Sequence, residues 1–154
     1  MRRHHLESEV AIRRPVDDVW AFISDLFNSP RARATTLASR KVTPGPLGLG
    51  SVVDQRVVFL GFETHVRFTA IEWDPPHVVV ASLSGPFIRS ARMRVELTAT
   101  SEGTRKIETY DLELSAGGIL LWPLLGPWTR REQARADRKQ KALLEASPLD
   151  TASE

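Results

Sequence analysis

Residues 117–146, GGILLWPLLGPWTRREQARADRKQKALLEA, form a segment long enough for a single large helix, in a chain that otherwise has the pattern of short strands. The segment is apolar up to Trp128, whereas residues 129–141 are dominated by charge. At a rise of about 1.5 Å per residue, the helix would run roughly 45 Å, which is longer than a small domain is wide. We therefore expect a curved sheet to bury the apolar part and water to surround the charged part. A helix held over a concave sheet leaves room for a ligand.

Two prolines, Pro123 and Pro127, interrupt the apolar part of this segment. An interior proline removes a helical hydrogen bond and clashes with the preceding turn. The prolines therefore predict either a kinked helix or a regular helix that begins near Pro127, preceded by an apolar loop over residues 118–126. The sequence is compatible both with a mobile gate and with a fixed cap at the mouth of a pocket.

The start of the chain has the pattern of a strand followed by helix. Residues 6–13 alternate between apolar and polar side chains, which is the period of a half-buried strand. A short amphipathic helix is expected over residues 15–26, because Pro15 and the two aspartates after it suit a first helical turn and apolar residues recur every three or four positions. A second short helix is expected around residues 30–36, before a short strand over residues 37–42.

An antiparallel meander follows the loop PGPLGLG at residues 44–50, whose glycines and prolines defeat helix and central strand alike. The breaks within the meander carry glycine, proline or aspartate and are short enough to join antiparallel neighbours. Its five expected strands are residues 51–60, 62–73, 77–84, 89–100 and 105–114. The sheet would then contain about six to seven strands.

Side-chain parity predicts one apolar and one solvated face for this sheet. The polar groups expected on the inner face are few, namely Gln55, Thr64 and Tyr110. The charged residues expected on the outer face are Glu63, His65, Arg67, Arg92, Arg94, Glu96, Asp111 and Glu113. A slip of one residue in the register would exchange the two faces.

Five stretches, taken in order, carry a family resemblance: VAIRRPVDDVWAFISD, PGPLGLGSVVDQRVVFLG, TAIEWDPPHVVVASLSGPF, EGTRKIETYDLEL and ILLWPLLGPWTRR. Together they resemble the polyketide cyclase/dehydrase-like branch of the START and Bet v 1-like superfamily, over residues 7–145. The resemblance implies an α+β helix-grip fold, with a deep cavity between sheet and long helix that binds hydrophobic small molecules. Lipid transfer, sequestration and cyclisation are among the activities it implies, without one shared catalytic set. The chain departs from the family at residues 31–33, RAR, where a tryptophan is common, which would make the lip of the pocket more basic.

We interpret the chain as a binding protein for a hydrophobic or amphipathic small molecule, such as a lipid or a polyketide-like compound, with no cofactor. The expected ligand-binding residues are those for which strand parity and the apolar part of the helix agree: Val57, Phe59, Thr64, Val66, Phe68, Met93, Val95, Tyr110, Leu112, Leu121, Leu125 and Trp128.

The alternative is an enzyme of the cyclase/dehydratase type. Acid–base catalysis needs a titratable group inside the cavity, and Tyr110 is a weak candidate for it. A phenol with a pKa of about 10 is a poor base at neutral pH, and parity places no histidine or carboxylate to activate it. The sequence therefore favours binding over catalysis.

The sequence offers residues for two further kinds of site, a metal site and a basic interaction surface. His4, His5, His65 and His77 have no partner at metal-ligand spacing, which favours surface histidines and no metal site. The charged part of the long helix has six basic residues against Glu132 and Asp137, behind two tryptophans, which is also the pattern of an interfacial helix. Acidic and basic residues three and four apart are, however, ordinary on an exposed helix face. An interaction module using this basic helix stays a further alternative, with transient membrane contact possible.

The composition is that of one globular domain. The chain has 154 residues, 42% of them hydrophobic, which fits a single domain over residues 1–146 with a disordered tail over residues 147–154. The absence of cysteine excludes disulfides and thiol chemistry. A net charge of +2 is too small to imply nucleic acid, so no nucleic-acid partner is expected.

No run approaches the ~18–20 apolar residues that span a bilayer. The first ten residues, MRRHHLESEV, lack the apolar stretch and cleavage site of a secretory signal, so we expect a cytoplasmic protein. The sequence leaves the oligomeric state open.

Overall fold

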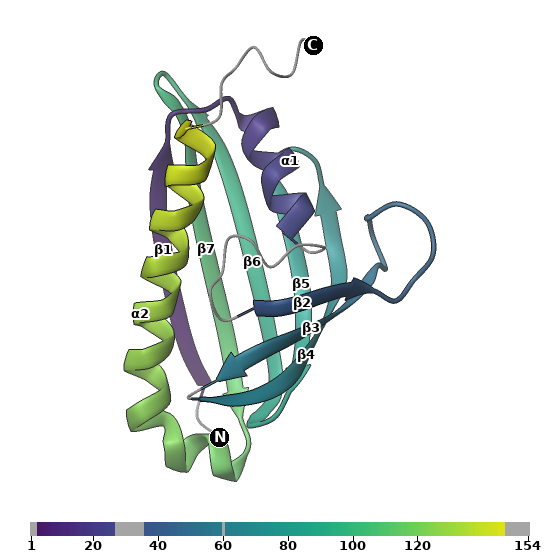
Figure 1. Ribbon diagram of the computed structural model, residues 1–154, viewed down its shortest axis with the longest axis vertical. Coiled ribbons are helices and arrows are strands. Elements are labelled where there is room, and N and C mark those ends of the chain that lie inside the picture. Colours follow the sequence, from purple (N-terminus) through teal and green to yellow (C-terminus); the bar gives the residue numbers. More distant parts are fainter. Residues whose placement is uncertain (1–2, 27–35, 60, 147–154) are drawn as a thin grey trace.

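The computed structural model describes residues 3–26, 36–59 and 61–146, and shows one antiparallel sheet with two helices on the same face (Figure 1). The seven strands of the described chain lie in the order β1-β7-β6-β5-β4-β3-β2. Their bounds are β1 (Arg3–Ile12), β2 (Thr36–Lys41), β3 (Val52–Phe59), β4 (Phe62–Asp74), β5 (Val78–Gly85), β6 (Ile88–Thr100) and β7 (Gly103–Leu114). The helices are α1 (Val16–Leu26) and α2 (Ala116–Ala146).

The expected α+β meander, first helix and long C-terminal helix are confirmed, with boundaries that differ by at most three residues. The second short helix expected around residues 30–36 falls on residues outside the described ones, except that Thr36 begins β2. The basic lip at residues 31–33 and the tail at residues 147–154 also lie outside the described residues.

Helix α2 is continuous from Ala116 and runs through both prolines. Ser115 caps its start, because the Gly118 amide donates to Ser115 Oγ at 3.3 Å. Pro123 and Pro127 stand on the exposed side of the helix, where solvent can satisfy the carbonyls that lose their helical donors. The alternative in which the regular helix begins near Pro127 is therefore wrong.

The burial of α2 differs from the expected division into a buried apolar part and an exposed charged part. Its buried residues are spread from one end to the other: Gly118, Leu125, Gly126, Ala136, Asp137, Gln140 and Leu144. In the apolar part, Leu120 and Leu124 are 79% and 65% exposed. The helical period selects one face along the whole length for contact with the sheet, whatever the local composition. That expectation is wrong, and polar Asp137 and Gln140 face the interior.

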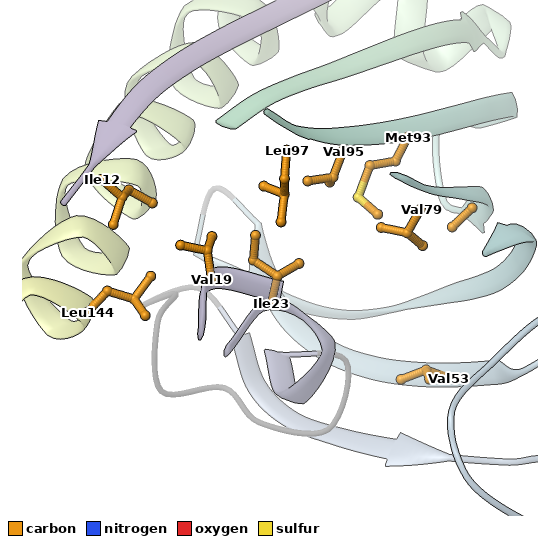
Figure 2. Packing of buried hydrophobic residues seen from close by; sticks show 10 residues of the cluster. Ile12, Val19, Ile23, Val53, Val79, Met93, Val95, Leu97 and Leu144 are labelled. Atoms are coloured by element: carbon orange, nitrogen blue, oxygen red, sulfur yellow. The ribbon is translucent and has the colours of Figure 1, made fainter. Parts of the chain in front are cut away.

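The hydrophobic core gathers at the α1 end of the sheet (Figure 2). Val19 and Ile23 of α1 point toward the inner face of β6, where they meet Val95 and Leu97. Leu144, near the end of α2, closes the same cluster. Side chains therefore fill the space under α1 and the end of α2, whereas a cavity lies under the first half of α2. Within the described chain, no helix has the length and apolar character needed to traverse a bilayer.

Candidate functional site

A cavity of about 250 Å³ lies between the inner face of the sheet and α2. Its floor consists of residues from β3 and β6 and of alternate residues from β4 and β7, as the period of a strand requires. Trp122, Leu125 and Trp128 cover it from α2, at spacings of three that bring them to one side of the helix. The wall is mainly aliphatic and aromatic, which suits an apolar ligand.

One rim of the cavity is the turn between β5 and β6, which carries Phe87 in a left-handed backbone conformation with φ of 67°. The Ser115 amide donates to the Phe87 carbonyl oxygen at 3.0 Å, which ties the start of α2 to this turn. Gly118 makes the close approach possible, because a Cβ atom there would lie 2.4 Å from the same oxygen. The contact holds Phe87 against the cavity.

A buried polar cluster forms another part of the wall. Lys106 of β7 is completely buried, and its three ammonium donors have three acceptors. The Nζ atom lies 3.2 Å from Glu108 Oε1, 2.9 Å from Asp137 Oδ1 and 2.7 Å from Gln140 Oε1. These acceptors come from β7 and α2, so the cluster joins the sheet to the helix. Two carboxylates offset the cost of burying the ammonium group.

Tyr110 extends this cluster into the cavity. Its hydroxyl donates to Glu108 Oε2 at 2.5 Å, so the Glu108 carboxylate joins Lys106 and Tyr110 through its two oxygens. Glu108 is 3% exposed, and both Glu108 and Tyr110 line the cavity. A phenol and a carboxylate in hydrogen-bond contact beside an apolar cavity can bind a polar group or exchange a proton with it.

A groove of about 590 Å³ between β1 and α2 also reaches this pair. Glu108 and Tyr110 line both the groove and the cavity. In the register of β1 and β7, Ser8 stands opposite Glu108. The Ser8 Oγ atom, which belongs to a residue that lines this groove, is buried without a hydrogen-bond partner in the described structure. The Tyr110–Glu108 pair can thus be reached both from the chamber and from this groove.

The sequence profile of a family described as polyketide cyclase/dehydrase and lipid transport matches residues 3–145. The chain belongs to this family. No curated protein matches the sequence.

The fold of this chain is similar to three solved structures. The Zhui aromatase/cyclase from Streptomyces sp. R1128 is 17% identical, with 94% of each chain covered and a TM-score of 0.81. A START superfamily protein from Mycobacterium smegmatis is 14% identical, with 92% of this chain and 99% of that chain covered and a TM-score of 0.75. Ara h 8.0201 is 14% identical, with 95% and 100% covered and a TM-score of 0.75. The architecture that this chain shares with all three is the helix-grip fold.

Most of the residues predicted to bind ligand line the cavity of this family member. They are Val57, Thr64, Val66, Phe68, Met93, Val95, Tyr110, Leu112, Leu125 and Trp128. Leu121 is not among the lining residues, and its neighbour Trp122 is. The side chain of Phe59 lies outside the described residues. Contact between these residues and a ligand stays a prediction.

The expectation that the inner polar groups are Gln55, Thr64 and Tyr110 is incomplete, because Lys106 and Glu108 also line the cavity. The expectation that no carboxylate is placed to activate Tyr110 is wrong. The parity that turns Tyr110 inward turns residues 106 and 108 inward as well, so the signal was present in the sequence. Charged residues are rarely buried without a partner, and the partners here come from a helix about 30 positions away in the chain.

The histidines divide into different environments. His4 is not a surface histidine, because its ring packs on Trp122 with centroids 4.2 Å apart and its Nε2 atom is buried without a partner in the described structure. His5 faces outward and contacts Asp111 through Nδ1 at 2.7 Å. The hydrogen bond to Asp111 raises the pKa of His5 above its ordinary value. Among the described residues, no three histidine, aspartate or glutamate side chains gather where they could hold a metal ion.

Proposed function

We propose that the protein binds a hydrophobic or amphipathic small molecule in the cavity between the sheet and α2. The observation that carries this proposal is an apolar chamber with one polar cluster in its wall. Apolar surroundings supply affinity through the removal of ligand surface from water, and a few placed polar groups supply orientation. Membership of a family described as acting in polyketide cyclisation, dehydration and lipid transport supports the same ligand class.

The volume of the cavity limits the size of ligand that it can hold. Its volume of about 250 Å³ exceeds that of an engineered apolar cavity of about 150 Å³ that takes up benzene. It lies just below the range of roughly 300–1,000 Å³ that is usual for small-molecule pockets. A bicyclic aromatic compound or a medium-length chain therefore fits the chamber better than a large lipid. Its polar group would lie at Tyr110 and Glu108, where a hydroxyl can both donate and accept a hydrogen bond.

Calorimetric titration with 1-naphthol and with decanoic acid tests the proposal. Val66→Trp places a large side chain on the floor of the cavity and is expected to abolish binding of whichever compound the wild type binds. His65→Trp introduces the same side chain one residue away on the outer, exposed face of β4 and is expected to leave binding unchanged. Equal affinities of wild type and Val66→Trp would show that the ligand lies elsewhere.

A second candidate function is acid–base catalysis of the cyclase/dehydratase type, and the contact between Tyr110 and Glu108 favours it. A carboxylate that accepts from the phenol can take up a proton that the phenol receives from a substrate, and can return it. The groove between β1 and α2 gives a second route to the same pair. Variants of Tyr110 and Glu108 separate this function from binding, because they affect turnover more than affinity.

A further inference from the structure

The outer face of α2 carries a continuous stripe that no other described element covers. Its members recur at spacings of four, three, four, four and three, so they form one line along the helix. All are exposed: Leu120, Leu124, Pro127, Arg131, Arg135 and Arg138. At about 1.5 Å per residue the line extends roughly 27 Å. We call these six residues the outer stripe.

The first half of the outer stripe is apolar. Leu120 is 79% exposed and Leu124 is 65% exposed, one helical turn apart on the same side. Pro123 and Pro127 beside them are also exposed. Two neighbouring leucines in water lose the free energy that burial would supply, and apolar groups gathered on a surface mark contact sites.

The second half of the stripe is positively charged. Each acidic residue of α2 already has an ion-pair partner. Asp137 faces inward and contacts Lys106, Glu132 contacts Arg135 at 3.4 Å, and Glu145 contacts Lys141 at 2.6 Å. In the described structure no ion pair forms at Arg130, Arg131, Arg138 or Lys139, and all four are exposed. The outer side of this half therefore presents uncompensated positive charge.

The order of leucines and arginines along the outer stripe indicates which kind of partner binds it. A second copy of the helix, packed antiparallel, would set leucines against arginines, and a parallel copy would set arginines against arginines. A nucleic acid would use the arginines and leave both leucines in water. An anionic lipid surface uses both, since leucines enter the boundary between headgroups and acyl chains while arginines meet the phosphates.

We propose that the outer stripe docks the protein onto an anionic lipid bilayer, with Leu120 and Leu124 entering the headgroup region and the arginines on lipid phosphates. This surface is separate from the cavity and its use requires no bound ligand. Trp122, Leu125 and Trp128, which cover the cavity, belong to the same turns of α2 as the two leucines. Docking therefore brings the roof of the cavity within one helix thickness of the lipid.

Co-sedimentation of the unliganded protein with vesicles tests the proposal. Wild type is expected to bind vesicles of phosphatidylcholine and phosphatidylglycerol, and to bind phosphatidylcholine alone much more weakly. Leu120→Ser/Leu124→Ser is expected to weaken partitioning about tenfold or more, whereas Leu49→Ser, which changes a leucine that is 72% exposed in the loop before β3, has no effect. Arg131→Gln is expected to weaken it about fivefold, with no effect of Arg92→Gln on the exposed face of β6.

Four results would overturn the proposal. Two of them concern wild type, namely equal binding to neutral and anionic vesicles, and no binding to either. Another is a double leucine variant with unchanged helical circular dichroism that partitions like wild type. The last is tighter binding to duplex DNA than to the vesicles, with an affinity for DNA that Arg131→Gln lowers and the leucine changes do not.

The affinity of the cavity for 1-naphthol is expected to be the same in all the stripe variants.

Discussion

At the scale of single residues, the hydrogen bond between Tyr110 and Glu108 separates the two candidate functions. If the cavity serves binding, Tyr110→Phe removes one hydrogen bond, worth about 0.5–1.5 kcal/mol net, and lowers ligand affinity by roughly tenfold at most. If the pair acts as acid and base, Tyr110→Phe and Glu108→Gln each lower turnover by about 10²–10⁴.

The measurement is turnover of a panel of aromatic and polyketide-like substrates by wild type and by both variants, alongside their affinities for 1-naphthol. We expect affinities within tenfold of wild type and no turnover. Clear turnover that collapses in both variants would replace the binding function with catalysis.

Lys106 provides a stability prediction at the same scale. Lys106→Met leaves Glu108 and Asp137 buried without their cation, which is expected to lower the free energy of unfolding by about 3–5 kcal/mol. The matched change Arg56→Met breaks the exposed contact with Glu63 at 2.8 Å and is expected to cost no more than about 1 kcal/mol. Urea denaturation of both variants gives the comparison. Similar losses would mean that the buried cluster holds no special share of the stability.

The inner face of β7 could be predicted from the sequence, but the burial of Lys106 could not. The alternation along β7 correctly predicted that Tyr110 and Leu112 face inward. The same alternation places Lys106 and Glu108 on the inner face. A buried lysine requires acceptors for its ammonium group. Asp137 and Gln140 become acceptors only because α2 packs on β7. The periodicity of the sequence predicts which face of β7 a residue occupies. It does not predict the contact between β7 and α2.

At the scale of elements, the joint between α2 and the β5–β6 turn supports the cavity rim. Gly118→Ala forces a Cβ atom to 2.4 Å from the Phe87 carbonyl oxygen, so the helix start must move away from the turn. Gly117→Ala meets the Phe87 ring at an ordinary 3.6 Å. Because alanine favours helix over glycine by about 1 kcal/mol, Gly117→Ala is expected to be neutral or stabilising and Gly118→Ala destabilising.

Thermal unfolding of the two glycine variants, each with and without 1-naphthol, checks this account. Gly118→Ala is expected to have the lower midpoint and the smaller ligand-induced rise, because the displaced rim exposes bound ligand to water. A Gly118→Ala protein as stable as Gly117→Ala would contradict a tight joint at Phe87.

The elements themselves were predicted well wherever a period was present. The alternation in residues 6–13 and the turn residues between later strands were sufficient for the meander, which is confirmed. The rotation of α2 about its axis was not predictable from its composition. Leu120 and Leu124 have the same hydropathy as buried Leu125, and only the docked sheet decides which of them is covered.

At the scale of the whole molecule, the fold combines a filled end with an open one. The core under α1 and the end of α2 stabilises the sheet, while the first half of α2 spans a chamber that its own side chains do not fill. A close-packed protein of this size would gain stability by filling that space, since empty volume forfeits contact energy. A retained chamber is therefore consistent with selection for a ligand.

Diffraction from crystals soaked with 6-bromo-2-naphthol tests ligand binding in the cavity most directly, because bromine can be located by its anomalous signal. We predict that the ligand binds there, with one strong bromine peak inside the chamber near Val66, Met93 and Trp128 and the hydroxyl density at Tyr110 and Glu108. A fully soaked crystal with no peak in the chamber, or with bromine only on the outer surface, would contradict it.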